Sequence, residues 1–156
     1  TQSPYINDTG PHGLTSASDI DDHVQTAYAV ADALYLAASP RPGSKVPPHR
    51  IPPQAQFYPG VYFNRRDWDF SVDITDWFEQ RVEAENMFKS HGHYEAFSRK
   101  RIEIAAGAAG WATGTGYAEG FVRATAELLP KISLSEYTVR AATESPLETH
   151  KRMVGE

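Results

Sequence analysis

Residues 72–90 carry the sequence VDITDWFEQRVEAENMFKS, in which a short extended segment leads directly into a helix. The first three residues predict the extended segment. Asp76, followed three residues later by Glu79, is a capping-box pattern that predicts the start of a helix. Apolar residues then recur at helical spacing through about Ser90, and Gly92 is expected to end the helix.

Further helices and short strands are expected on both sides of this stretch. Apolar residues at helical spacing predict helices over residues 18–38 and 94–109, the second weakened near its end by glycines. Short strands are expected over residues 57–63 and 117–122. The mixture indicates an α/β protein, with too few strong strands for a complete parallel sheet.

Three segments lack a clear helical pattern. Residues 1–17 are rich in turn-forming residues. Residues 39–56 are rich in proline, which excludes a helix or a central strand there. We expect this loop to border a substrate cleft. Residues 124–156 predict a soft tail with one short strand near residues 137–139.

Composition excludes several classes of protein. With 40% apolar residues the chain is expected to fold, and its net charge of −5 makes nucleic acid and anionic membranes poor partners. The absence of cysteine excludes disulfides, thiolate nucleophiles and cysteine zinc sites. No stretch approaches the length of a membrane-spanning helix. The first residues carry no readable targeting signal, and a cytoplasmic location is favoured.

Acidic residues and a histidine gather at the start of the first predicted helix, in the order Ser18-Asp19-Ile20-Asp21-Asp22-His23. Carboxylates there commonly cap a helix and face the positive end of its dipole, which explains Asp19 and Asp21. A cationic imidazole is unfavourable at that end, whereas a neutral, metal-bound imidazole is not. His23 lies on the apolar stripe and is expected to point inward, where Asp22 could hydrogen-bond the ring and orient it.

Three other patterns allow both a chemical and a structural interpretation. His91 and His93 could chelate zinc on a strand, but histidine and Gly92 also suit the C-terminal end of a helix, which we favour. The sequence Gly114-Thr115-Gly116 lacks the third glycine of a dinucleotide loop and predicts a tight turn. Glu119 lies in an apolar segment, so we predict that it is buried and structural, bonded to backbone amides or to a cation.

The order of these motifs resembles the second half of the PIG-L (LmbE-like) zinc-dependent N-deacetylases. Those proteins commonly show His-x-Asp-His opening a helix, an Asp-Ile-Ser-like helix start, a Lys-x-x-Ala-x-x-x-His-x-Ser-Gln helix and a late Tyr-Ala-Glu-Ala-Phe. The resemblance covers roughly residues 10–122. The matching segments here are Asp22-His23, Asp73-Ile74-Thr75, residues 84–90 and Gly116-Tyr117-Ala118-Glu119-Gly120-Phe121.

The resemblance implies a Rossmann-like three-layer α/β sandwich, of which residues 1–156 supply the C-terminal half of a single domain. It also implies a Zn²⁺-dependent amidohydrolase that removes an N-acyl group from an amino sugar or its conjugate. His23 matches the family's later zinc ligand, and Asp22 is the residue beside it. The family's other two ligands and its general base belong to a His-Pro-Asp-Asp motif that this sequence lacks. A separate N-terminal half is therefore the expected partner.

The sequence departs from the family at three positions. Ile20 stands where the family has the first histidine of His-x-Asp-His, a residue that helps to stabilise the oxyanion. Phe88 and His91 stand where histidine and glutamine are common. Two rival interpretations stay open: a non-catalytic α/β binding or partner module, and a hydrolase that uses His91 and His93 and binds metal unaided.

Overall fold

The computed structural model of the chain describes residues 17–52, 57–59, 68–126, 128–132 and 134–156, and the side chains of these residues except 17–24 and 57–59. The chain divides into two compact units. One contains residues Thr1–Asp69 with Phe121–Leu128, and the other contains Phe70–Gly120 with Leu129–Glu156. None of the described helices is long and apolar enough to cross a membrane.

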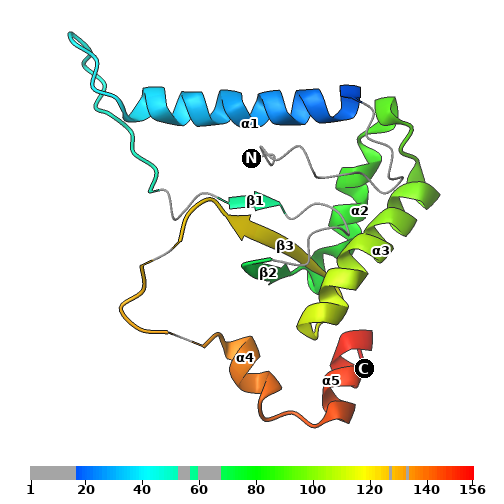
Figure 1. Cartoon of the computed structure of the whole chain (residues 1–156). Coiled ribbons are helices and arrows are strands. Elements are labelled where there is room, and N and C mark those ends of the chain that lie inside the picture. Colours follow the sequence, from blue (N-terminus) through cyan, green and yellow to red (C-terminus); the bar gives the residue numbers. More distant parts are fainter. Residues whose placement is uncertain (1–16, 53–56, 60–67, 127, 133) are drawn as a thin grey trace. The chain divides into compact units, whose positions relative to one another are not determined.

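The first unit is built on a long helix, α1 (Ala17–Ala38), which confirms the helix predicted over residues 18–38 (Figure 1). The hydroxyl of Ser39 donates to the carbonyl of Tyr35 over 2.8 Å and so satisfies one of the last helical carbonyls. Residues 39–52 then form turns and irregular backbone, as predicted for the proline-rich loop. Residues 53–56 of that predicted loop and the turn-rich residues 1–16 lie outside the described part.

A small sheet contains β1 (Phe57–Pro59), β2 (Phe70–Asp73) and β3 (Ala118–Arg123) in the order β1-β3-β2. β1 pairs antiparallel with β3, with Pro59 opposite Phe121. At the two ends of β2, the amide of Asp69 donates to the carbonyl of Phe121, and the amide of Ile74 donates to the carbonyl of Tyr117. The residue numbers rise along one strand as they fall along the other, so β2 and β3 are also antiparallel. The mixture of helices and strands agrees with a coarse α/β class. Residues 60–63 of the predicted first strand lie outside the described part.

The described part of the second unit contains six helical segments, and their bounds correct the predicted ones. The expected helix over residues 76–90 is divided, and Gly92, with φ of 78°, ends its last turn. The helix expected over residues 94–109 continues to Thr113 despite its glycines. The segments are η2 (Thr75–Trp77), α2 (Phe78–Asn86), η3 (Lys89–His91), α3 (Glu95–Thr113), α4 (Glu136–Ala141) and α5 (Pro146–Val154).

The start of the α2 segment differs from the predicted capping box. No side chain caps either η2 or α2, so the pairing of Asp76 with Glu79 is wrong. The carboxylate of Asp73 takes this role, because its Oδ1 accepts from the amide of Thr75 over 2.9 Å and from its hydroxyl over 2.6 Å. Aspartate commonly bonds the backbone two residues on, and here that local bond turns the end of β2 into a helix.

The core of the second unit lies between α2 and α3, which pack side by side (Figure 1). Phe78 and Val82 from α2 meet Ile102 and Ala106 from α3, and all four are buried. The ring of Tyr117, the residue before β3, stacks on Phe78 with 4.1 Å between ring centroids. This contact places the end of the sheet against the helix pair.

The C-terminal region is helical, so the predicted soft tail with a strand near residues 137–139 is wrong. Ser135 caps α4 by accepting from the amide of Thr138. Ser145 and Glu148 form a full capping box at α5, with Pro146 in its first turn. A serine followed by proline and then glutamate is a recognisable helix start, and these two caps outweigh the β-branched residues that suggest a strand.

Backbone crowding at the end of α3 requires a glycine. A Cβ atom on Gly110 would lie 2.5 Å from the carbonyl oxygen of Gly116 and 2.8 Å from that of Thr115. Gly114, with φ of 76°, ends the helix in the left-handed conformation and makes the close approach possible.

We predict that Gly110→Ala lowers the free energy of unfolding by about 2–3 kcal/mol, because backbone atoms must move to admit the methyl group. Gly107→Ala on the same helix is the matched control. Its Cβ would meet only a ring carbon of Tyr117 at 3.9 Å, so a gain of up to about 1 kcal/mol is expected from helix propensity. Thermal or urea denaturation measures both; equal effects from the two substitutions would contradict the close approach.

Candidate functional site

The residues predicted to hold zinc lie on α1. Asp22 and His23 fall in the second turn of the helix, which begins at Ala17. Their side chains lie outside the described part, as do those of Ser18 and Asp19. The inward direction of His23, its zinc bond and the orienting role of Asp22 therefore stay predictions.

Among the described side chains, no group of three or more histidines and carboxylates is placed to hold a metal ion. Zinc sites use at least three protein ligands. The described side chains therefore contain no complete zinc site.

A polar cluster does form where β2 ends and β3 begins, and we name it the Asp73 cluster: Asp73, Thr75 and Thr115, with Tyr137 nearby. Besides its bonds to Thr75, the Asp73 carboxylate accepts through Oδ2 from the hydroxyl of Thr115 over 2.7 Å. The hydroxyl of Thr75 in turn accepts from the amide of Tyr117 over 3.1 Å. The cluster thus joins β2, the start of α2 and the turn before β3.

The Asp73 carboxylate is a structural acceptor. Burial raises the pKa of this carboxyl group, but the hydrogen bonds from Thr75, Thr115 and Tyr137 lower it by more than burial raises it. The pKa of Asp73 therefore lies below its ordinary value of 3.8. Its oxygens accept three hydrogen bonds, from the amide and hydroxyl of Thr75 and the hydroxyl of Thr115, and all three donors belong to the adjoining backbone segments. We therefore assign it to positioning the backbone.

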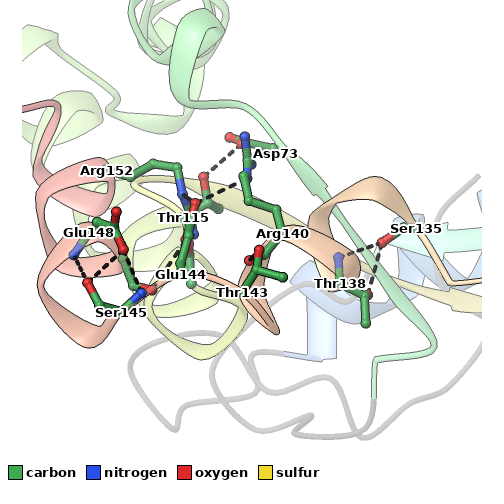
Figure 2. A network of polar contacts seen from close by, with 12 residues as sticks. Asp73, Thr115, Ser135, Thr138, Arg140, Thr143, Glu144, Ser145, Glu148 and Arg152 are labelled. Atoms are coloured by element: carbon green, nitrogen blue, oxygen red, sulfur yellow. Dashed lines mark hydrogen bonds and ion pairs between the residues drawn. The ribbon is translucent and has the colours of Figure 1, made fainter.

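The last helix is fastened to the same turn (Figure 2). Arg152 donates to Glu144 over 2.7 Å and also to the backbone carbonyl of Gly114. The hydrogen bonds from Arg152 lower the pKa of Glu144 and raise that of Arg152 itself. This link ties α5 to the α3–β3 turn; the sequence interpretation missed it because it treated residues 124–156 as a tail.

A second group of charged residues, the Glu85 cluster, contains Glu85, Arg81, Arg101, His93 and Glu119. Glu85 on α2 is buried, with 6% of its side chain exposed. It accepts from Arg81 over 3.0 Å and from Arg101 over 2.6 Å. Two guanidinium groups therefore compensate one buried carboxylate, which links α2 to α3.

Glu119 on β3 only partly follows its prediction. Its side chain is 38% exposed, so the expectation of burial is wrong. The reason is the alternation along β3, which buries Ala118 and Gly120 and leaves Glu119 on the other face. The expected bond to a cation is confirmed, because Arg81 donates to Glu119 over 2.7 Å.

The two histidines after α2 do not face a common metal site. His91 ends η3 and is exposed, which agrees with the favoured interpretation of a helix end. His93 is mostly buried, with Nδ1 3.1 Å from Glu85 and Nε2 3.2 Å from the Arg101 guanidinium. A metal ion at that Nε2 would meet a cation at close range. The segment Gly114-Thr115-Gly116 forms the predicted turn.

Comparisons of the chain with protein-family models, with curated proteins and with solved structures find no match.

We predict that Asp73→Asn lowers the free energy of unfolding by about 1–3 kcal/mol, because an amide cannot accept all the bonds of the carboxylate. The pKa of Asp73 is depressed in the folded chain, so its stabilisation is present above pH 4 and is lost as the pH falls through the folded pKa. Denaturation from pH 7 to 2 should show that Asp73→Asn removes this acid-dependent component. The exposed Asp76→Asn should leave it unchanged; an equal effect there would contradict the assignment.

Glu85→Gln and Glu119→Gln test the two ends of the Glu85 cluster. Glu85→Gln should cost about 3 kcal/mol, since it removes a buried carboxylate from Arg81 and Arg101, although Arg81 keeps its pair with Glu119. Glu119→Gln should cost less than about 1 kcal/mol, because both Glu119 and Arg81 are more than a third exposed. A larger loss from Glu119→Gln, measured by urea denaturation, would show that the surface pair dominates.

Proposed function

We propose that the chain is the C-terminal part of a zinc-dependent N-deacetylase of the PIG-L type, acting on an N-acyl amino sugar or its conjugate. The observation that carries the proposal is the order of three motifs along the sequence. Asp22-His23 comes first, Asp73-Ile74-Thr75 follows, and Tyr117-Ala118-Glu119-Gly120-Phe121 comes last. A Rossmann-like sandwich completed by another polypeptide segment is part of this proposal.

The positions of the motifs in the fold support it. The first motif lies in the opening turns of α1. In the second unit, Asp73 ends β2 and starts the following helix, and Glu119 on β3 holds α2 through Arg81. Two of the three motifs thus contain residues whose contacts hold backbone elements together. These contacts need particular side chains at these positions, which gives the two motifs a physical reason.

The chemistry of amide hydrolysis accounts for the first motif. An amide is a poor electrophile, and bound zinc supplies a Lewis acid that polarises the carbonyl and lowers the pKa of water. His23 would provide one imidazole ligand, with Asp22 hydrogen-bonded to the ring to hold its orientation. The remaining two ligands and the general base would come from a His-Pro-Asp-Asp motif on the partner segment.

A non-catalytic partner module is the second candidate, and exposed apolar side chains favour it. Trp111 on α3 is 76% exposed, and Leu128 and Ile132 after β3 are still more exposed. Exposed apolar side chains of this kind could contact another polypeptide. The same side chains also suit the first proposal, which requires a partner segment as well, so metal content discriminates between the two candidates.

We predict that His23→Ala abolishes stoichiometric zinc in the natural protein and lowers kcat/KM for an N-acetylglucosaminide by more than about 100-fold, since loss of a ligand should exceed loss of an orienting group. Asp22→Asn should weaken zinc binding by about 10- to 100-fold. Elemental analysis and release of acetate measure the two effects.

The exposed His150→Ala on α5 is the matched control and should retain both zinc and activity. Full zinc occupancy in His23→Ala would refute the ligand assignment. A natural protein that contains no zinc and releases no acetate would favour the partner module.

A further inference from the structure

His93 lies within the Glu85 cluster, and its two ring nitrogens face groups of opposite charge. Nδ1 lies 3.1 Å from Oε1 of Glu85, and Nε2 lies 3.2 Å from a terminal nitrogen of the Arg101 guanidinium. A guanidinium only donates hydrogen bonds, so Nε2 must accept and therefore carries no proton. The contacts thus select a neutral ring with its proton on Nδ1.

We propose that His93 is a proton-sensitive clasp, which holds the connection between α2 and α3 (residues 87–94) closed when neutral and loosens it when protonated. The proposal rests on the arrangement around the ring and is independent of the proposed deacetylase function.

Protonation of His93 would oppose the contacts that hold it. A proton on Nε2 would face the N–H of Arg101 at 3.2 Å and would add a third cation to Arg81 and Arg101. Glu85 attracts the protonated ring, but its Oε1 is already occupied by Arg101 at 2.6 Å, and Nδ1 makes no well-aligned hydrogen bond. The repulsion is therefore only partly offset.

The other neighbours of the ring act in the same direction or are uncharged. The ring of His91, from η3, has its centroid 6.3 Å from that of His93, and an imidazole can be neutral or cationic but supplies no anion. Phe88 and Phe97 supply the remaining ring contacts, at 6.1 and 5.1 Å, and carry no charge. Acid thus adds positive charge to the connection without adding an anion.

The connection itself is held by few bonds. The amides of His91 and His93 donate to the carbonyl of Phe88 over 2.9 and 3.4 Å, and that of Gly92 donates to Lys89 over 3.0 Å. The side chains of Met87 and Phe88 are more than half exposed. A segment with few buried contacts opens locally at low cost, so loss of the clasp should open it before the core unfolds.

Amide hydrogen exchange of the purified chain at pH 7.5 and 5.0, corrected for intrinsic exchange rates, tests the proposal. The amides of His91, Gly92 and His93 should lose protection by roughly 10-fold at pH 5.0, while that of the buried Ala106 does not. His93→Gln should remove the response, because its amide can accept from Arg101 and donate to Glu85 without titrating. The matched control His91→Gln should respond like the unaltered chain.

Protection that does not change with pH, or a response that persists in His93→Gln, would overturn the proposal. Should His93→Gln fail to fold, nitrogen-15 NMR of the unaltered chain decides the premise directly. A neutral ring at pH 7.5 with its proton on Nδ1 supports the clasp, and a proton on Nε2 contradicts it.

Discussion

The hydrogen bonds of the Asp73 carboxylate are the interactions on which the second unit most depends. Its bonds to Thr75 turn β2 into the start of the helical segment, and its bond to Thr115 fixes the turn from which β3 leaves. The same turn is crowded against Gly110 and is held from the other side by Arg152. The Asp73 side chain therefore joins the strand, the start of the helical segment and the turn, and Arg152 links the C-terminal helix to the same turn.

The Glu85 cluster has a complementary role further along α2. A buried carboxylate with two arginines holds α2 against α3, and one of those arginines reaches Glu119 on β3. The Asp73 cluster and the Glu85 cluster thus connect the elements that contribute the small apolar core of Phe78, Val82, Ile102 and Ala106. In the proposed deacetylase this unit would be a scaffold, while the reacting groups would come from α1 and a partner segment.

Much of this arrangement is predictable from local sequence. The helices around residues 18–38 and 95–113, the strand at Ala118 and the turn at Gly114 follow from apolar spacing and glycine. Contacts across long sequence separations are not predictable in this way. The helix start depends on Asp73 and not on the predicted Asp76, and Arg152 fixes a region that was predicted to be a tail. The capping pattern Ser145–Glu148 was the available signal for that region.

The candidate zinc site stays a prediction, because a single histidine on a helix defines no geometry and the side chain of His23 lies outside the described part. The exposure of Glu119 shows the same difficulty, since its apolar neighbours in sequence lie on the opposite face of β3. The partner of Glu119, Arg81, is 38 residues away in the sequence. The sequence could therefore predict a cation as the partner, but not which one.

The most direct test is nitrogen-15 NMR of the histidine rings in the natural protein as zinc is added. The account predicts that one ring nitrogen of His23 shifts with one equivalent of zinc, while His91 and His93 do not respond. Zinc shifts at His91 and His93 with none at His23 would contradict it.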